Sequence, residues 1–350
     1  MSTSSNNRIE GGAGGFDAII GQQRPAGMLA AALQKNEVPH AMLFTGEAGV
    51  GKKTTAGCFA MACNCKHLAT GRDGFPNAAS GFNPCGHCGP CRKIDSGNHP
   101  DFHYIKPSGT QIKIDQVRFL CSALALKPNE ASRRIVLISD AHLMNAEAGN
   151  ALLKILEEPP ENTVFILTAP EAADMLPTIV SRCRHIRFNP IPEDLIEAYL
   201  IKHGNMAPEN AMVVAALANG SIGRALAIKD DQWVIRHRKW IIDQMEIIFR
   251  RASGRDLYFA EALAKDREKL ILGLEIIKSW LRDIAVSKVF PDRIGNRDFK
   301  PTIKALSEQI NMDTLIEKTY AVWQAERAIK ANANIRLAVE AMVLKLSDSR

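Results

Sequence analysis

A glycine-rich loop between an apolar run and a helical pattern constrains the fold of this chain more than any other feature. Residues 46–54 read GEAGVGKKT, follow the apolar run 40–44 and lead into a helical pattern that lasts to about residue 65. Glycines let backbone N–H groups turn toward a phosphate, and a lysine at the position of Lys52 reaches its β and γ oxygens. The sequence therefore predicts a phosphate-binding loop. A tight strand-to-helix turn is the alternative, because G-x-x-x-x-G-K also arises by chance.

Two positions that ATP hydrolysis needs depart from the usual pattern. The residue after the loop lysine usually carries a hydroxyl that ligates Mg²⁺, but here it is Lys53, and Thr54 lies about a hundred degrees further around the helix. Asp140 ends an apolar run, where it would hold the water shell of Mg²⁺ or act as a helix N-cap. Ala141 follows it and has no carboxylate to activate water. The candidate nucleotide-binding residues of this region are Gly46, Gly49, Gly51, Lys52, Lys53, Thr54 and Asp140.

Further apolar runs predict the sheet to which this loop belongs. They occupy residues 102–105, 135–138, 164–167 and 186–188, with helical patterns between most of them. The runs are continuous rather than alternating, which is typical of parallel strands covered on both faces. We therefore expect a doubly wound α/β domain.

The rest of the chain reads as helices. Strand-like runs stop after Pro190 and Pro192, and the helical stretches are 194–203, 207–217, 236–250, 254–264, 267–289 and 313–346. In the last stretch Leu337, Ala341 and Leu344 fall at i, i+4 and i+7, which is typical of an amphipathic helical domain.

Composition excludes several classes of protein. At 350 residues, of which 46% are hydrophobic, two or three domains are expected. The 44 basic and 38 acidic residues are interspersed, so the net charge of +6 does not indicate nucleic-acid binding. No apolar run reaches eighteen residues, and residues 1–15 lack the basic and apolar regions of a signal peptide. We expect a leader without structure at 1–15, a cytoplasmic location and no membrane contact.

A cysteine cluster predicts a metal site. Cys85, Cys88 and Cys91 supply three thiols at C-x-x-C-x-x-C spacing, and Cys63 and Cys65 lie upstream near the end of the loop helix. In a cytosolic chain this pattern favours metal over disulfides, and four thiolates make a closed, structural zinc site. A set of free thiols is the alternative for the cluster, and His87 is an alternative ligand.

Six segments in a fixed order resemble the AAA+ clamp-loader family of bacterial DNA polymerase III. They are residues 16–22 (FDAIIGQ), the glycine loop, the cysteine cluster, residues 150–160 (NALLKILEEPP), residues 181–183 (SRC) and residues 220–226 (GSIGRAL). They span almost the whole chain, and the combination of ALLKILEEPP with SRC about twenty residues later is the most specific.

The resemblance implies a domain order. It implies a RecA-like AAA+ domain at 16–190 with a zinc module at 65–91, a helical lid at 191–231 and a helical collar at 232–350 through which five subunits form a ring. It also selects Cys65 as the fourth zinc ligand, because Asn64-Cys65 resembles the pair that begins this module in the family. The implied zinc ligands are Cys65, Cys85, Cys88 and Cys91.

The resemblance also implies three further site residues. Arg182 matches an arginine finger that enters the ATP site of the neighbouring subunit and stabilises charge on the γ-phosphate. Thr168 matches a polar sensor residue at a strand end, and Arg224 matches a lid arginine that contacts nucleotide. Without the resemblance, each would be read as an ordinary surface or strand-end residue.

The predicted function is that of a non-hydrolysing clamp-loader subunit, since Lys53 and Ala141 depart from the motor type of the family. Its expected partners are the gamma/tau ATPase subunits and a delta subunit in a pentameric ring, and through that complex a sliding clamp and primed DNA. Zinc is the expected cofactor, and the sequence leaves open ATP and Mg²⁺ binding by the loop. The alternative is an active motor in which Thr54 and Glu157 or Glu158 compensate. A zinc protein that reads DNA is disfavoured, because the cysteine turns offer few basic or aromatic side chains.

Overall fold

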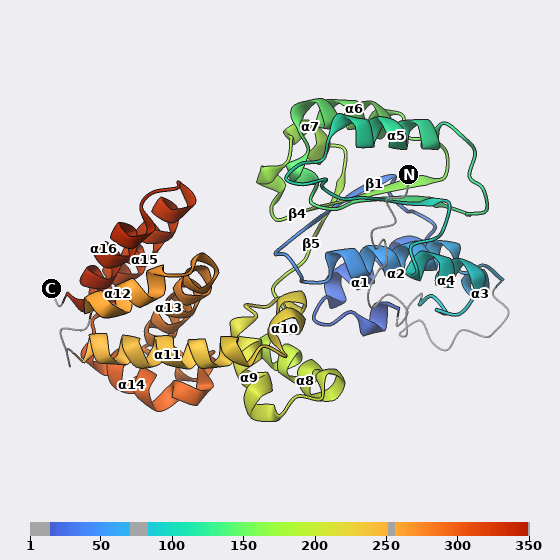
Figure 1. Ribbon diagram of the computed structural model, residues 1–350. Helices are drawn as coiled ribbons and strands as arrows, with labels where there is room; N and C mark the ends of the chain where they lie inside the picture. The colour runs from blue at the N-terminus through green and yellow to red at the C-terminus, as the bar shows by residue number, and fades with distance from the viewer. Residues whose placement is uncertain (1–14, 71–82, 251–255, 349–350) are drawn as a thin grey trace. The chain divides into compact units, whose positions relative to one another are not determined.

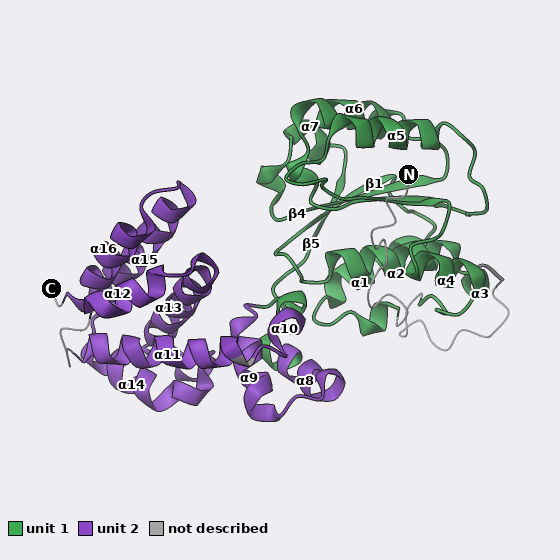
Figure 2. Cartoon of the chain, viewed as in Figure 1, with its two compact units in different colours: residues 1–195, 220–224 green, residues 196–219, 225–350 purple. Residues whose placement is uncertain are grey.

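The computed structural model describes residues 15–70, 83–250 and 256–348. It divides into two compact units: residues 1–195 with 220–224, and residues 196–219 with 225–350 (Figure 2). The expected leader at 1–15 falls almost wholly outside the described residues. Between the first and second cysteines of the expected zinc module, the structure describes helix α3 (Lys66–Thr70) and does not describe residues 71–82.

The first unit is built on a five-stranded parallel sheet (Figure 1). The spatial order is β2-β3-β4-β1-β5, so β1, the strand that precedes the glycine loop, lies inside the sheet between β4 and the edge strand β5, and every pair is parallel. This confirms the expected doubly wound sheet of a RecA-like AAA+ domain. The strands are β1 (Ala41–Thr45), β2 (Phe102–Ile105), β3 (Arg134–Ile138), β4 (Thr163–Ala169) and β5 (Arg184–Arg187).

Helices cover both faces of the sheet, which explains the continuous apolar runs. Alternate residues of a strand point to opposite faces, and in β1 Met42 packs in one core whereas Leu43 packs in the other. Figure 1 shows α1, α2 and α4 on one face and α5, α6 and α7 on the other. These helices are α1 (Gln23–Gln34), α2 (Lys52–Asn64), α4 (Gly89–Asp95), α5 (Ile114–Leu124), α6 (Ala146–Glu157) and α7 (Pro177–Val180).

Short 3-10 turns complete this unit between the longer elements. They are η2 (Phe16–Ala18), η3 (Ala141–Leu143) and η4 (Ala172–Asp174).

The second unit is helical and has its own core around Trp280 of α13. Among the described residues, no helix combines the length and apolar character needed to cross a bilayer. The helices that fall wholly or partly in this unit are α8 (Glu193–Gly204), α9 (Pro208–Leu217), α10 (Ile222–Ile228), α11 (Gln232–Phe249), α12 (Asp256–Ala264), α13 (Arg267–Ser287), η5 (Pro291–Arg293), η6 (Arg297–Phe299), α14 (Lys300–Gln309), α15 (Met312–Lys330) and α16 (Ile335–Ser347).

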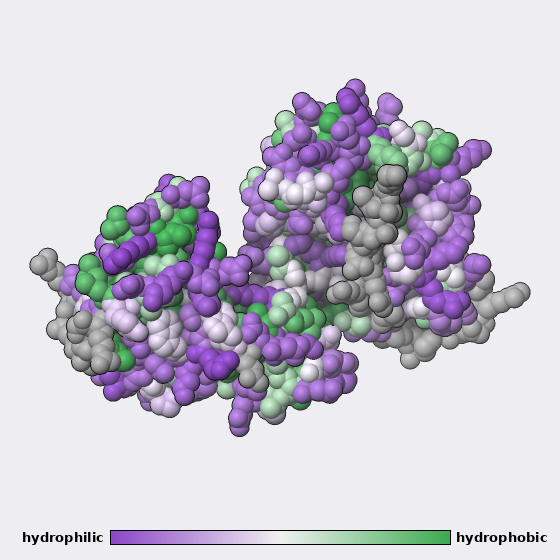
Figure 3. Space-filling model, in the orientation of Figure 1, coloured by the Kyte–Doolittle hydropathy of each residue, from purple (hydrophilic) through white to green (hydrophobic). Residues whose placement is uncertain are grey.

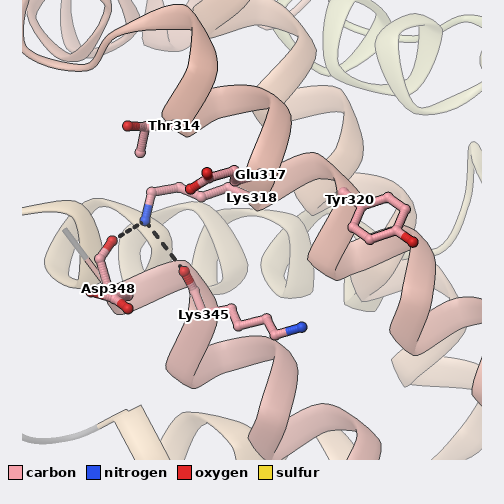
Figure 4. Close-up of a pocket in the computed structure, with 6 residues that line it drawn as sticks. All are labelled: Thr314, Glu317, Lys318, Tyr320, Lys345 and Asp348. Carbon is pink, nitrogen blue, oxygen red and sulfur yellow. Dashed lines mark hydrogen bonds between the residues drawn. The ribbon is translucent and has the colours of Figure 1, made fainter. Parts of the chain in front are cut away.

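A buried lysine ties the last two helices together. The ammonium of Lys318 on α15 donates to the carbonyl oxygen of Leu346 at 2.5 Å. It also donates to the carbonyl oxygen of Asp348 at 2.6 Å and lies 3.5 Å from that of Lys345 (Figure 4). A cation is favourable at the carbonyl end of a helix. Lys318 therefore caps α16 from a neighbouring helix.

The predicted pattern of the C-terminal helices was wrong in two respects. The stretch 313–346 is two helices, because Asn332 adopts a left-handed conformation and the side chain of Asn334 caps α16. Leu337 and Leu344 face solvent, and the buried residues of α16 are Val339, Met342, Val343 and Leu346.

The predicted lid and collar boundaries stay predictions. Residues 220–224 of the expected lid belong to the first unit, and the remainder of 196–231 belongs to the second.

Candidate functional site

The glycine loop lies at the carboxyl end of β1, an inner strand of the sheet. It follows Thr45 of β1 and ends at Gly51, which is the N-cap of α2. Gly46, Gly49 and Gly51 all have positive φ, at 139°, 78° and 100°. These are conformations that side chains other than glycine rarely adopt. The loop therefore has the backbone geometry of an anion-binding turn at a helix N-terminus.

The two lysines after the loop have different partners. The ammonium of Lys52 donates to the carbonyl oxygens of Gly46 and Glu47, the second at 2.8 Å. Burial lowers the pKa of Lys52, and the nearby carboxylates of Asp140 and Glu47 oppose that shift. The ammonium of Lys53 lies 4.6 Å from the centroid of the Tyr104 ring on β2, a cation–π contact. Lys53 is thus packed against an aromatic ring at the position where a hydroxyl would ligate Mg²⁺.

Asp140 and Thr168 lie together at the ends of neighbouring strands. The backbone N–H of Asp140 donates to the Thr168 hydroxyl at 3.0 Å, and Thr168 is buried at the end of β4. Asp140 itself is exposed and left-handed, and its side chain makes no capping hydrogen bond to η3. Its proposed capping role therefore has no hydrogen bond to support it. Ala141 is buried and presents only a methyl group.

The start of α10 packs directly on the loop. The N–H of Gly223 donates to the Gly49 carbonyl at 3.0 Å. A Cβ on Gly49 would stand 2.2 Å from the Ser221 Oγ, and one on Gly223 would stand 3.0 Å from the Gly49 Cα. The Ser221 hydroxyl accepts a hydrogen bond from the backbone N–H of Arg224, which lies on the first turn of α10. We call this contact between Gly49 and Gly223 the glycine clasp.

Gln22 supports the loop from the other side. Its buried side chain donates to the carbonyl oxygens of Val50, at 3.2 Å, and Asn189, at 2.6 Å, and accepts the N–H of Asn189. Gln22 is the last residue of the FDAIIGQ segment, and the sequence alone indicates no role for it. The one sequence feature that could indicate its role is a glutamine directly after Gly21, and this pattern is too common to be specific.

Arg182 and the glycine loop lie at opposite ends of the strands β5 and β1. Strand β5 runs parallel to β1 with Arg184 beside Met42, so Arg182 precedes β5 whereas Gly46 follows β1. At about 3.3 Å per residue, these two positions are roughly 20 Å apart along the strand direction. The guanidinium donates to the Thr178 carbonyl at 2.9 Å and to the Glu157 carboxylate at 2.6 Å. Arg182 is therefore too far from the loop to serve it.

Four thiols meet beside the phosphate-loop helix. The sulfur atoms of Cys65, Cys85, Cys88 and Cys91 all lie within 4.8 Å of one another. The N–H of Cys85 points at the Cys65 sulfur at 3.4 Å, and the N–H of Cys88 points at the Cys85 sulfur at 3.3 Å. Such N–H donors stabilise thiolates, so the donor set fits a tetrahedral ion that prefers sulfur.

The alternative ligands are placed differently. Burial raises the pKa of Cys63 to about 12, and its sulfur is not part of the four-thiol group. His87 lies with His67 and Cys85 in a second, more exposed group of possible ligands. The remaining thiols are ordinary: burial raises the pKa of Cys58 to about 12 and that of Cys183 to about 11.

Comparisons with known proteins agree on one complex. Residues 21–192 match the family described as "DNA polymerase III, delta subunit". DNA polymerase III subunit delta' of Bacillus subtilis is 28% identical, over 93% of this chain and 96% of that protein. Subunit delta' of Haemophilus influenzae is 30% identical, over 71% of this chain and 72% of that protein. Subunit tau of Bacillus subtilis is 27% identical, over 95% of this chain but only 61% of that protein.

Proposed function

The chain belongs to the clamp-loader family of DNA polymerase III subunits, and from that membership we propose that it is a delta-prime-type subunit that does not itself hydrolyse ATP. In this proposal it lends Arg182 to the ATP site of a neighbouring subunit while the complex loads a sliding clamp on primed DNA. Its partners are the gamma/tau ATPase subunits and a delta subunit in a ring of five.

The observation that carries the proposal is the buried methyl group of Ala141 beside Asp140. An ATPase needs a carboxylate there to take the proton of the attacking water. Lys53 adds a second loss, because its ammonium packs on Tyr104 where a Mg²⁺ ligand would stand. The glycine loop keeps the shape of a cradle, so what this site lacks is catalytic chemistry.

The geometry of Arg182 supports action in trans. About 20 Å of sheet separates it from the loop of its own chain, and its side chain is half-buried rather than enclosed. A guanidinium presented at the surface stabilises developing charge on a γ-phosphate without any local hydrolysis.

The four-thiol group fits a structural zinc ion. Cys65, Cys85, Cys88 and Cys91 would hold it with no open position, so the ion would supply cross-linking rather than catalysis. The second unit would supply the collar of the ring, and apolar side chains gather on its surface over α15 and α16 (Figure 3).

The experiment compares the purified chain with the reconstituted clamp-loader complex. Alone, the chain is expected to turn over ATP no faster than a Lys52→Ala control, with Mg²⁺ present. In the complex, Arg182→Ala is expected to lower the kcat of ATP hydrolysis by about tenfold or more, since arginine fingers contribute several orders of magnitude at a single site. The control Arg184→Ala, an exposed arginine of β5, should leave turnover unchanged.

A motor of the gamma/tau type is the second candidate, favoured by the similarity to subunit tau over almost the whole chain. Magnesium-dependent turnover by the purified chain at rates above the Lys52→Ala control would establish it and remove the first proposal. A nucleotide titration with and without Mg²⁺ separates an occupied but silent loop from an empty one.

A further inference from the structure

Arg182 is held by a carboxylate whose position is otherwise unfavourable. Glu157 is the last residue of α6, where helix carbonyl groups already place partial negative charge. Its Oε1 accepts a hydrogen bond from the Arg182 Nη2 at 2.6 Å. A carboxylate gains nothing from its own helix at that position, so its favourable interaction is with Arg182.

A second tether fixes the orientation of the same guanidinium. The Nη1 of Arg182 donates to the Thr178 carbonyl of α7 at 2.9 Å, and lies 3.5 Å from the Ser181 hydroxyl. Two tethers on two different nitrogens of a planar group define its plane. The guanidinium has five N–H donors, so several are left for a phosphate after both contacts.

We propose that Glu157 is a positioning residue that holds Arg182 in the orientation in which it meets the neighbouring subunit's ATP. The inference rests on the proposed function, in which Arg182 acts in trans. Glu157 touches no nucleotide in this role and acts only through the arginine. The competing explanation is an ordinary surface ion pair, which would contribute little to stability and nothing to catalysis.

Glu158 provides a matched control. It is the next residue, it is exposed like Glu157, and within the described residues it forms no ion pair. Replacing either glutamate changes the local charge by the same amount, so a difference between the two variants reports the contact with Arg182.

The test is the steady-state ATP hydrolysis of the full reconstituted complex. Glu157→Ala is expected to lower kcat by roughly three- to tenfold at unchanged KM for ATP, because the arginine keeps its charge but loses its orientation. Glu157→Gln keeps an accepting oxygen and should lose less, and Glu158→Ala should match the unmodified complex. In an Arg182→Ala background, Glu157→Ala should have no further effect.

Different results overturn different claims. If Arg182→Ala lowers kcat and Glu157→Ala does not, the positioning role of Glu157 is wrong and the arginine finger stands. A higher kcat in Glu157→Ala would mean that Glu157 restrains the arginine, which also contradicts the inference.

If Arg182→Ala itself has no effect, the proposed function fails. Thermal unfolding of each variant, measured in parallel, should be unchanged; a lower transition confined to Glu157→Ala would support a purely structural ion pair.

Discussion

At the residue scale, the glycine clasp joins parts of the chain that lie 174 positions apart. Gly223 must approach the loop backbone so closely that even a methyl group would press on Gly49. In a helix, alanine is ordinarily about 1 kcal/mol more favourable than glycine. Close approach to the phosphate loop is therefore the reason for glycine at position 223.

Replacing glycine by alanine in a helix usually stabilises a protein, but at the glycine clasp we expect the opposite. Gly223→Ala should destabilise the first unit by about 1 kcal/mol, which lowers its thermal unfolding temperature, and should speed amide exchange in residues 46–51. Gly27→Ala, in the interior of α1 with nothing within 4 Å of the added Cβ, should instead stabilise by about 0.5–1 kcal/mol. Equal effects at the two glycines would show that the clasp contributes nothing.

Residue-level chemistry could be predicted from the sequence only where it follows a motif. The glycines, the two lysines and Cys85, Cys88 and Cys91 were predicted from spacing, whereas Cys65 and Arg182 were predicted from the family resemblance. The contact of Arg182 with Glu157 joins residues 25 positions apart, and the role of Gly223 depends on a backbone approach. Neither leaves a pattern in the sequence, because tertiary packing alone creates both contacts.

At the element scale, α2 links the glycine loop to the four-thiol group. It begins at Lys52 and its C-cap is Cys65, while α4 contributes Cys91 and is capped by Cys88. A metal ion held by these thiols would pin the end of α2 to α4. The four-thiol group and the glycine loop thus share one short helix.

The zinc proposal predicts one zinc ion per chain, measured by mass spectrometry of the purified protein. Cys91→Ser should lose the ion and lower the thermal unfolding temperature by about 5–10 °C, corresponding to ~2–3 kcal/mol in a domain of this size. Cys121→Ser, which removes a thiol outside the group, should retain zinc. Full zinc content in Cys91→Ser would contradict the ligand set.

Elements were the most predictable level of the fold. Five apolar runs corresponded to five strands. For β1, β3 and β4 the reason is that they are buried along their whole length, so they have no polar side; the edge strand β5 is exposed at three of its four residues. The last helices were less predictable, since α16 has apolar residues around much of its circumference. The pattern Leu337, Ala341, Leu344 has helical spacing, yet α12 and α15 pack against the other face. Periodicity identifies a helix but does not say which apolar face is buried.

At the scale of the whole molecule, α15 has an exposed apolar face of the kind that usually marks a protein–protein interface. Ile316, Tyr320 and Trp323 are spaced at i, i+4 and i+7 and are 60%, 54% and 47% exposed. Arg327 lies over the Trp323 ring at 5.5 Å. Aromatic residues with an adjacent arginine are typical of the centres of protein interfaces.

This face predicts how the chain joins its complex. Ile316→Glu should weaken the binding of this chain to the other clamp-loader subunits by roughly tenfold or more, because it places a charge in an apolar interface. Co-elution of the subunits in size-exclusion chromatography measures this loss. Val289→Glu, at an equally exposed apolar residue of the same unit, should assemble normally. Normal assembly of both variants would mean that the ring contact lies elsewhere on this unit.

The parallel sheet gives such a subunit a direction. Its strands place the glycine loop at their carboxyl ends and Arg182 before the amino end of β5. In the proposed function, one flank of the subunit would therefore receive an arginine and the opposite flank would donate one. A motor does both. A subunit that donates an arginine but does not hydrolyse ATP leaves one interface of the ring without an active ATP site. A ring that contains one such subunit would therefore have a defined first and last active ATP site. The register of β5 against β1, with Arg184 beside Met42, sets Arg182 and the glycine loop at opposite ends of the strands. With only one of these two sites active, the subunit would not be equivalent to its neighbours in the ring.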